Sequence, residues 1–407
     1  MTASVLISPK PTPGAVDLRD HIPALDAVRG VAILLVLIFH FGPFGLGLTS
    51  SSPFIDRLDV LISRAGWIGV DLFFVLSGFL ITGILYDAKR SKHYFRNFYV
   101  RRVLRIFPLY YGALLIFLVV LPWLLAEHAG VQLMKRDAIW YWTYLSNVRI
   151  AYNGWPGFGA IGHFWSLAVE EQFYLVWPVI VLALSPRHLQ AACLACVIGA
   201  LAVRVGLNVE GNETAAFVLT PARIDALAVG AYLAISARGP TGLRRISRWA
   251  LPSAALLSGA LLAIFVLRKG FVAQDPIVST VGHTLLACLF GAILVLALTS
   301  ARDSFIGSIC ASSFLCFFGR YSYALYVFHH PMLFFRPGAI PLTVVPTIGG
   351  SQLLRQLVFL ILATGVSVSI AVVSWHLYEK QFLKLKKLFP YQSREKIDSP
   401  LVLGVDK

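Results

Sequence analysis

The sequence predicts an all-α, polytopic membrane protein, a bundle of about ten transmembrane helices with both termini in the cytoplasm. The first observation is composition: 57% of the 407 residues are hydrophobic and 14% are charged, with a mean hydropathy of +0.74. A soluble globular chain has about 25% charged residues. The second is that its apolar stretches reach the ~20 residues that a helix needs to cross a bilayer. The third is the uneven distribution of Lys and Arg along the chain.

Ten apolar stretches satisfy the length criterion. Backbone polar groups in lipid must be paired internally, and the stretches lack the strict alternation of a membrane strand, so each predicts a helix. They are residues 25–44, 67–86, 103–125, 163–184, 190–207, 220–236, 249–267, 278–298, 314–335 and 355–378.

Basic residues concentrate in the segments that this topology places in the cytoplasm. The loop at 87–105 and the tail at 384–407 are rich in Lys and Arg, and together with other inner segments they hold most of the chain's 35 basic residues. This bias is typical of cytoplasmic loops. A net charge of +15 therefore indicates attraction to anionic membrane lipids or an anionic soluble substrate, and we expect no nucleic-acid partner.

The chain divides into one membrane domain with two short tails. Residues 1–24 contain Pro9, Pro11 and Pro13 and lack an apolar core, which predicts a flexible cytoplasmic tail. Residues 25–383 form the membrane domain, and residues 384–407 form a basic cytoplasmic tail. The sequence has none of the common zinc or phosphate-loop signatures, so we expect no metal site.

The first span carries ionisable residues on one face. Arg29 and His40 are eleven residues apart, which is about 20° beyond three whole turns and about 16 Å along the axis. Asp26 falls close to the same stripe. Such groups in a membrane interior usually face a cavity or a partner. The alternative is that Arg29 reaches the lipid headgroups and that His40 caps a backbone group.

The second and third spans add a carboxylate, a polar notch and an arginine cluster. Asp71 lies in the first turns of the second span, and Ser77 creates with Gly78 a notch where a helix or a substrate can approach closely. The third span opens with three arginines whose forked guanidinium groups suit phosphates, although they also serve as topology anchors. They are Arg101, Arg102 and Arg105.

Later spans supply general acid–base candidates. His163 and Glu170 are seven residues apart, nearly on one helix face, whereas Glu171 is expected to point elsewhere. Further polar residues in the spans, each of which also has a structural explanation when taken alone, are Arg223, Asp225, Tyr326 and His329.

Taken in order, these segments resemble the acyltransferase 3 family of integral-membrane O-acyltransferases. The matching segments are R-x10-H at 29–40, G-V-D-L-F-F-V-L-S-G-F-L at 69–80, R-R-x-x-R-I-x-P-x-Y-Y at 101–111, W-S-L-x-x-E-x-x-F-Y at 165–174, R-x-D-A-L-x-x-G at 223–230, S-Y-x-x-Y-x-x-H-x-P at 322–331 and S-W-x-x-x-E at 374–379. Gln381 departs from the family pattern, where a proline often follows the glutamate. The match extends from residue 25 to about residue 383.

The resemblance implies transfer of an acyl group, commonly acetyl, from cytoplasmic acyl-CoA to a hydroxyl of a sugar or cell-surface glycan at the bacterial cytoplasmic (inner) membrane. The partners are then an acyl-CoA co-substrate, a carbohydrate acceptor and membrane lipids, with no permanently bound cofactor. The resemblance also implies that Arg29 and His40 are the functional pair, and it favours Arg29 and the arginine cluster as donor-binding residues. The remaining polar residues are expected to bind substrate or support the site.

Imidazole can act either as a general base or as a nucleophile that carries the acyl group. We favour His40 as the base, because that role needs no second transfer step, and Glu170 as its catalytic partner. A membrane transporter that uses the same buried charges is the alternative function, and a structural partner of a polysaccharide assembly complex is a third. The ordered motifs favour the enzyme.

Overall fold

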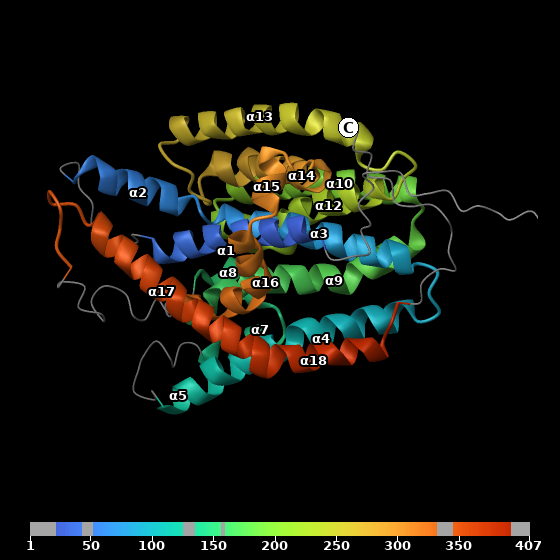
Figure 1. Cartoon of the computed structure of the whole chain (residues 1–407), viewed down its shortest axis with the longest axis horizontal. Coiled ribbons are helices and arrows are strands. Elements are labelled where there is room, and N and C mark those ends of the chain that lie inside the picture. The colour runs from blue at the N-terminus through green and yellow to red at the C-terminus, as the bar shows by residue number, and fades with distance from the viewer. Residues whose placement is uncertain (1–21, 43–51, 125–134, 156–158, 332–344, 392–407) are drawn as a thin grey trace, which may run out of the picture.

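The computed structural model describes residues 22–42, 52–124, 135–155, 159–331 and 345–391. The described part is a bundle of helices (Figure 1) in which nine helical segments are long and apolar enough to cross a membrane. This confirms the polytopic helical bundle. Most residues of the two predicted tails, 1–24 and 384–407, lie outside the described residues. The location of the termini in the cytoplasm stays a prediction.

Nine of the ten expected spans coincide with these long segments. The exception is 314–335, whose described part overlaps the shorter helix α16 (Ser313–Phe328) of 16 residues, followed by a turn at 330–331; residues 332–335 lie outside the described residues. The structure also adds an unexpected helix, α2 (Phe54–Arg64), ahead of the second span.

Helix α1 (Pro23–Phe41) packs against α16 through glycines on both helices. A Cβ on Gly30 of α1 would lie 2.1 Å from the carbonyl oxygen of Leu315, and one on Gly319 of α16 would lie 1.8 Å from that of Asp26. No side chain fits at either position, so the two backbones approach as closely as in small-residue membrane interfaces. The contact fixes the face on which α1 carries its polar residues.

Glycines also allow a close approach between α3 (Ile68–Ala88) and α12 (Thr220–Ala237). A Cβ on Gly78 or on Gly230 would lie 1.9 Å from a backbone carbonyl oxygen of the other helix, that of Leu227 or of Val75. The two residues of the expected notch therefore have different surroundings. Gly78 packs against the backbone of α12, and Ser77 points in another direction.

Other helices surround these two pairs. In Figure 1, α13 runs along one side of the molecule, α4 and α18 run along the opposite side, and α9 lies between, next to α3. Their bounds are α4 (Tyr94–Leu115), α5 (Leu121–Leu124), α7 (Ala138–Trp142), α8 (Ser146–Asn153), α9 (Trp165–Ala183), α10 (Pro186–Val209), α11 (Glu213–Val218), α13 (Arg244–Leu267), α14 (His283–Thr299), α15 (Phe305–Cys310), α17 (Leu353–Ser374) and α18 (Lys380–Lys384).

Candidate active site

Two cavities open beside α1, at opposite ends of that helix. The first, of ≈ 150 Å³, is lined by Arg29 in the N-terminal half of α1, and we call it the arginine cavity. The second, of ≈ 530 Å³, is lined by His40 in the last turn of α1, and we call it the histidine cavity. The predicted stripe on the first span therefore faces two chambers rather than lipid. Arg29 also forms an ion pair with Asp26 at 2.9 Å.

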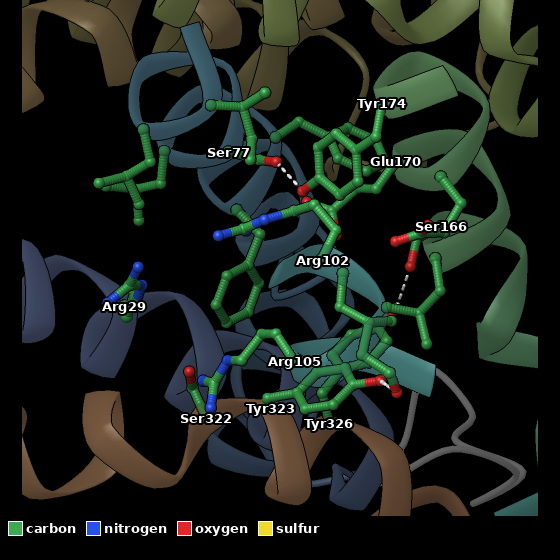
Figure 2. A pocket seen from close by; sticks show the side chains of 18 of the residues that line it. Arg29, Ser77, Arg102, Arg105, Ser166, Glu170, Tyr174, Ser322, Tyr323 and Tyr326 are labelled. Carbon is green, nitrogen blue, oxygen red and sulfur yellow. Dashed lines mark hydrogen bonds between the residues drawn. The ribbon is translucent and has the colours of Figure 1, made fainter. Parts of the chain in front are cut away.

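Among the described residues, three cations and two carboxylates line the arginine cavity. Arg29 comes from α1, Arg102 and Arg105 come from the first half of α4, and Glu170 and Glu171 come from α9. Figure 2 labels the three arginines and Glu170. The Arg105 guanidinium lies over aromatic rings on two other helices, which hold it in place. The cavity is thus a pocket of mixed charge with an excess of cations.

A hydroxyl pair lies beside Glu170 in this cavity. The Ser77 and Tyr174 hydroxyls are hydrogen-bonded to each other, and Figure 2 shows both next to the Glu170 side chain. Since Gly78 is covered by α12, the helix rotation that buries Gly78 also presents Ser77 to the cavity. The expectation that Ser77 takes part in a polar site is consistent with this placement.

Arg101 does not share the position of its two neighbours. Its guanidinium donates to the carbonyl oxygens of Lys386 at 3.0 Å and Phe389 at 3.1 Å, and lies over the Tyr391 ring. It is not among the residues that line the arginine cavity. The structure therefore does not bring Arg101 together with Arg102 and Arg105, because consecutive helix residues point about 100° apart and Arg101 faces the C-terminal segment.

Four histidine rings gather around the end of α1. The ring centroids of His329 and His330 are each 4.7 Å from that of His40, and the His163 centroid is 6.4 Å from it. His163 and His330 stack, with centroids 4.8 Å apart and planes 13° apart. His40, His163 and His330 line the histidine cavity, while His329 supports them from behind.

The hydrogen bonds fix the tautomers of two of these rings. His329 Nδ1 lies 2.8 Å from the carbonyl oxygen of Tyr326, so in the neutral ring Nδ1 carries the proton and His329 Nε2 is an acceptor. His40 Nδ1 lies 3.0 Å from the carbonyl oxygen of Val36 and 3.2 Å from His329 Nε2. Both partners are acceptors, so His40 Nδ1 carries the proton and Nε2 carries the basic lone pair.

Tyr326 and Val70 line both cavities and form part of the boundary between them. The Tyr326 hydroxyl donates to the carbonyl oxygen of His163 at 3.0 Å and bonds the Ser166 hydroxyl at 2.5 Å. These contacts tie the α16 side of the boundary to the start of α9. The expectation that Tyr326 belongs to the site is consistent with this position.

His163 and Glu170 do not share a cavity. His163 lies in a 3-10 turn, Gly159–Phe164, and lines the histidine cavity, whereas Glu170 lies in α9 and lines the arginine cavity. The spacing argument failed because it assumed one continuous α-helix. Both ring nitrogens of His163 are buried and lack a hydrogen-bond partner among the described residues.

The expectation for Glu171 is also wrong, because Glu171 lines the same cavity as Glu170. The cavity is lined by residues of α3, α4 and α9, and it is wide enough that two adjacent faces of α9, those of Glu170 and Glu171, both line it. One carboxylate oxygen of Glu171, Oε1, is buried without a hydrogen-bond partner in the described part of the chain.

Three predicted residues form a buried ion-pair network away from both cavities. Asp71 binds Arg223 at 2.6 Å, with His283 at 3.6 Å from the same oxygen, and Asp225 binds Arg204 at 2.8 Å. None of the five lines either cavity. A direct contact of Asp71, Arg223 or Asp225 with substrate is not supported, and their position suits support of the helices that carry the site.

Of two further cavity residues, the sequence marked His330 as a polar candidate without assigning it a role, and Arg64 was missed. His330 stands next to a predicted site residue, and a turn after Phe328 brings its ring onto the cavity wall. Arg64 ends the unexpected helix α2 and lines the histidine cavity. The pairing partners Arg204 and His283 were also missed, although both are ionisable residues inside predicted spans.

The family assignment follows from comparison with known sequences. The sequence model described as an acyltransferase domain, that of the acyltransferase 3 family, matches residues 22–376. The chain belongs to the acyltransferase 3 family. The match covers the lining residues of both cavities, from Arg29 to His330, and confirms the resemblance drawn from the ordered motifs.

Curated relatives of this acyltransferase 3 chain are named as O-acetyltransferases. The chain is 30% identical over 379 residues to the putative peptidoglycan O-acetyltransferase YrhL of Bacillus subtilis, an alignment that covers 88% of this chain and 54% of the relative. It is 27% identical to the peptidoglycan O-acetyltransferase OatA of Listeria monocytogenes (77% and 50% covered) and to the O-acetyltransferase OatA of Staphylococcus aureus (77% and 51%). The alignments thus span about half the length of these relatives. No solved structure matches the chain.

Proposed function

We propose that this chain is a membrane O-acyltransferase that moves an acetyl group from acetyl-CoA to a hydroxyl of a cell-surface glycan at the bacterial cytoplasmic membrane. The observation that carries the proposal is the pair of cavities, one cationic and one lined by histidines, at the two ends of α1. The acetylated glycans named for the relatives support a carbohydrate acceptor.

The donor is assigned to the arginine cavity. Guanidinium groups bind phosphates by paired, charge-assisted hydrogen bonds, and the cavity presents those of Arg29, Arg102 and Arg105. Its volume of ≈ 150 Å³ is too small for a whole coenzyme A molecule, so it receives one part of the donor. The acyl end then points along α1 toward the boundary at Tyr326.

The acceptor hydroxyl is assigned to the histidine cavity, where His40 is the base. His40 Nε2 takes the hydroxyl proton while that oxygen attacks the thioester carbonyl carbon. The carbon–sulfur bond then breaks, the ester forms, and the coenzyme A thiolate takes the proton from His40 Nε2, which gives the free thiol and restores the neutral imidazole. The contact between His40 Nδ1 and His329 supports the neutral tautomer that this step requires.

The same proposal gives Glu170 the task of orienting the donor. It lies beside the Ser77–Tyr174 hydroxyl pair and on the cavity that holds the cations. Glu170 does not line the histidine cavity, which argues against direct proton abstraction from the acceptor. We therefore retain Glu170 as a site residue on the donor side.

The test is release of free coenzyme A thiol by the purified chain in proteoliposomes supplied with acetyl-CoA and peptidoglycan fragments. We expect thiol release matched by acetyl ester on the glycan. A transporter would move solute across the vesicle without consuming thioester. Solute uptake with no thiol release would overturn the enzyme assignment.

A further inference from the structure

The histidine cavity has the size and wall composition of a saccharide site. Its volume of ≈ 530 Å³ lies within the roughly 300–1,000 Å³ of small-molecule pockets. Aromatic side chains make up much of its wall: Phe39, Trp67, Trp155, Trp165 and Phe217. Trp155, at 43% exposure, offers the most accessible of the three indole rings. Ring faces of this kind pack against the C–H faces of sugars while polar groups bind the hydroxyls.

Among the described residues, one Arg lines this cavity without a counter-charge. Arg64, the last residue of α2, makes no ion pair or hydrogen bond with any described residue, and no Asp or Glu is among the described residues that line the cavity. The nearest acidic residues along the chain are engaged elsewhere. Asp59 accepts a hydrogen bond from Ser63 at 3.2 Å, and Asp275, next to the cavity residue Gln274, binds Arg268 at 2.7 Å.

A guanidinium on the wall of an aromatic cavity selects for an anion. Its five donors match a carboxylate or a phosphate, and low-dielectric walls strengthen the attraction. We infer that the acceptor is an anionic saccharide, whose carboxylate or phosphate is bound by Arg64 while its ring packs on the aromatic wall. This inference rests on the proposed function only in taking the histidine cavity as the acceptor site.

The positions of Arg64 and His40 on the cavity wall also bear on which acceptor is selected and how it is oriented. Arg64 and His40 both line the cavity but come from different helices, so they reach it from separate points. An acceptor anchored by its negative group at Arg64 presents a defined part of its ring to His40. Arg64 is then a specificity-determining residue, and a neutral sugar binds without this anchor.

The experiment measures binding, so its outcome is independent of catalysis. The full chain is placed in phosphatidylcholine nanodiscs, and saturation-transfer NMR titrations compare methyl β-glucoside, methyl β-glucuronide and glucose 6-phosphate. One or two charge-assisted hydrogen bonds predict that at least one anionic probe binds about 10–100-fold more tightly than the neutral one. Arg64→Gln should remove the preference. The matched control is Arg57→Gln, an exposed arginine on the same helix, and it should retain the preference.

Four results would overturn the inference: equal affinity for the three probes, no binding of either anion, a preference that survives Arg64→Gln, or a preference that Arg57→Gln also removes. A second arm adds phosphatidylglycerol to the nanodiscs. If the anionic lipid abolishes the preference, Arg64 serves a lipid headgroup rather than the saccharide. Thiol release from acetyl-CoA, measured separately, tells a failure of this inference from a failure of the enzyme assignment.

Discussion

At the scale of single residues, the ionisable side chains divide between the cavity proposed for the donor and the cavity proposed for the acceptor. His40 and His163 lie on one cavity, and Arg29, Glu170 and Glu171 lie on the other. Ionisable groups at membrane depth cost several kcal/mol unless they face a cavity or a partner. Their division between two cavities that share the lining residues Val70 and Tyr326 suits a transfer reaction with two substrates.

The two neighbouring carboxylates of α9 give the first prediction. Glu170→Gln should lower turnover by about 10-fold or more, because an amide cannot provide the negative charge that balances the arginines. Glu171→Gln should also impair turnover, since Glu171 lines the same cavity. Steady-state acetyl transfer by the purified variants measures both.

Glu210→Gln is the control for these two changes, because Glu210 is exposed at the end of α10. It should leave turnover unchanged. Full activity of Glu170→Gln would remove this carboxylate from the site.

At the scale of elements, the arginine cluster of α4 has members with different surroundings. Arg102 and Arg105 line the arginine cavity, while Arg101 binds the carbonyl oxygens of the C-terminal segment. The double change of Arg102 and Arg105 to Ala should raise the KM for acetyl-CoA by about 10–100-fold, which corresponds to the loss of one or two charge-assisted hydrogen bonds. Kinetics at varied acetyl-CoA concentration measures it.

Arg101→Ala serves as the internal control for that double change. It should lower the thermal stability of the chain and leave the KM for acetyl-CoA close to that of the parent. An unchanged KM in the double variant would make these arginines topology anchors.

Glycines at the helix crossings give a stability prediction at the same scale. Gly230→Ala forces a Cβ against the backbone of α3, where only 1.9 Å is free, and should destabilise the fold by about 1–3 kcal/mol. Gly199 lies in the interior of α10, where an added Cβ would meet no atom of another described element within 4 Å. Gly199→Ala should therefore stabilise the chain by about 0.4–1 kcal/mol. Thermal unfolding in detergent compares the two, and equal Tm values would contradict the close-packing account.

At the scale of the whole molecule, the sequence predicted the helical bundle well, because the length and apolarity of a span depend on the bilayer alone. It also singled out Arg29 and His40 on one face of the first span, and each of them lines a cavity beside that helix. It could not tell which side chains of α4, α9 and α12 face a cavity, because that depends on neighbouring helices. Thus Arg101 faces the C-terminal segment and Asp225 binds Arg204.

The orientation of the chain in the membrane is a prediction about the whole molecule. Ten crossings with cytoplasmic termini follow from the distribution of Lys and Arg, and they place the arginine cavity toward the cytoplasm and the histidine cavity toward the outside. Reporter fusions after Lys407 and within the loop at 126–162 should give signals from opposite sides of the membrane. Signals from the same side would contradict this orientation and, with it, the assignment of acetyl-CoA to the arginine cavity.

The most direct test of the account is acetyl transfer by His40 variants. With the chain in proteoliposomes and labelled acetyl-CoA, His40→Ala should lower transfer by about 10²–10⁴-fold with normal membrane insertion, and His40→Gln should not restore it, because an amide cannot take the proton. Without acceptor, the parent chain should retain no label. Label found on His40 would replace the general-base step with an acyl-histidine intermediate, and normal turnover by His40→Ala would contradict the account as a whole.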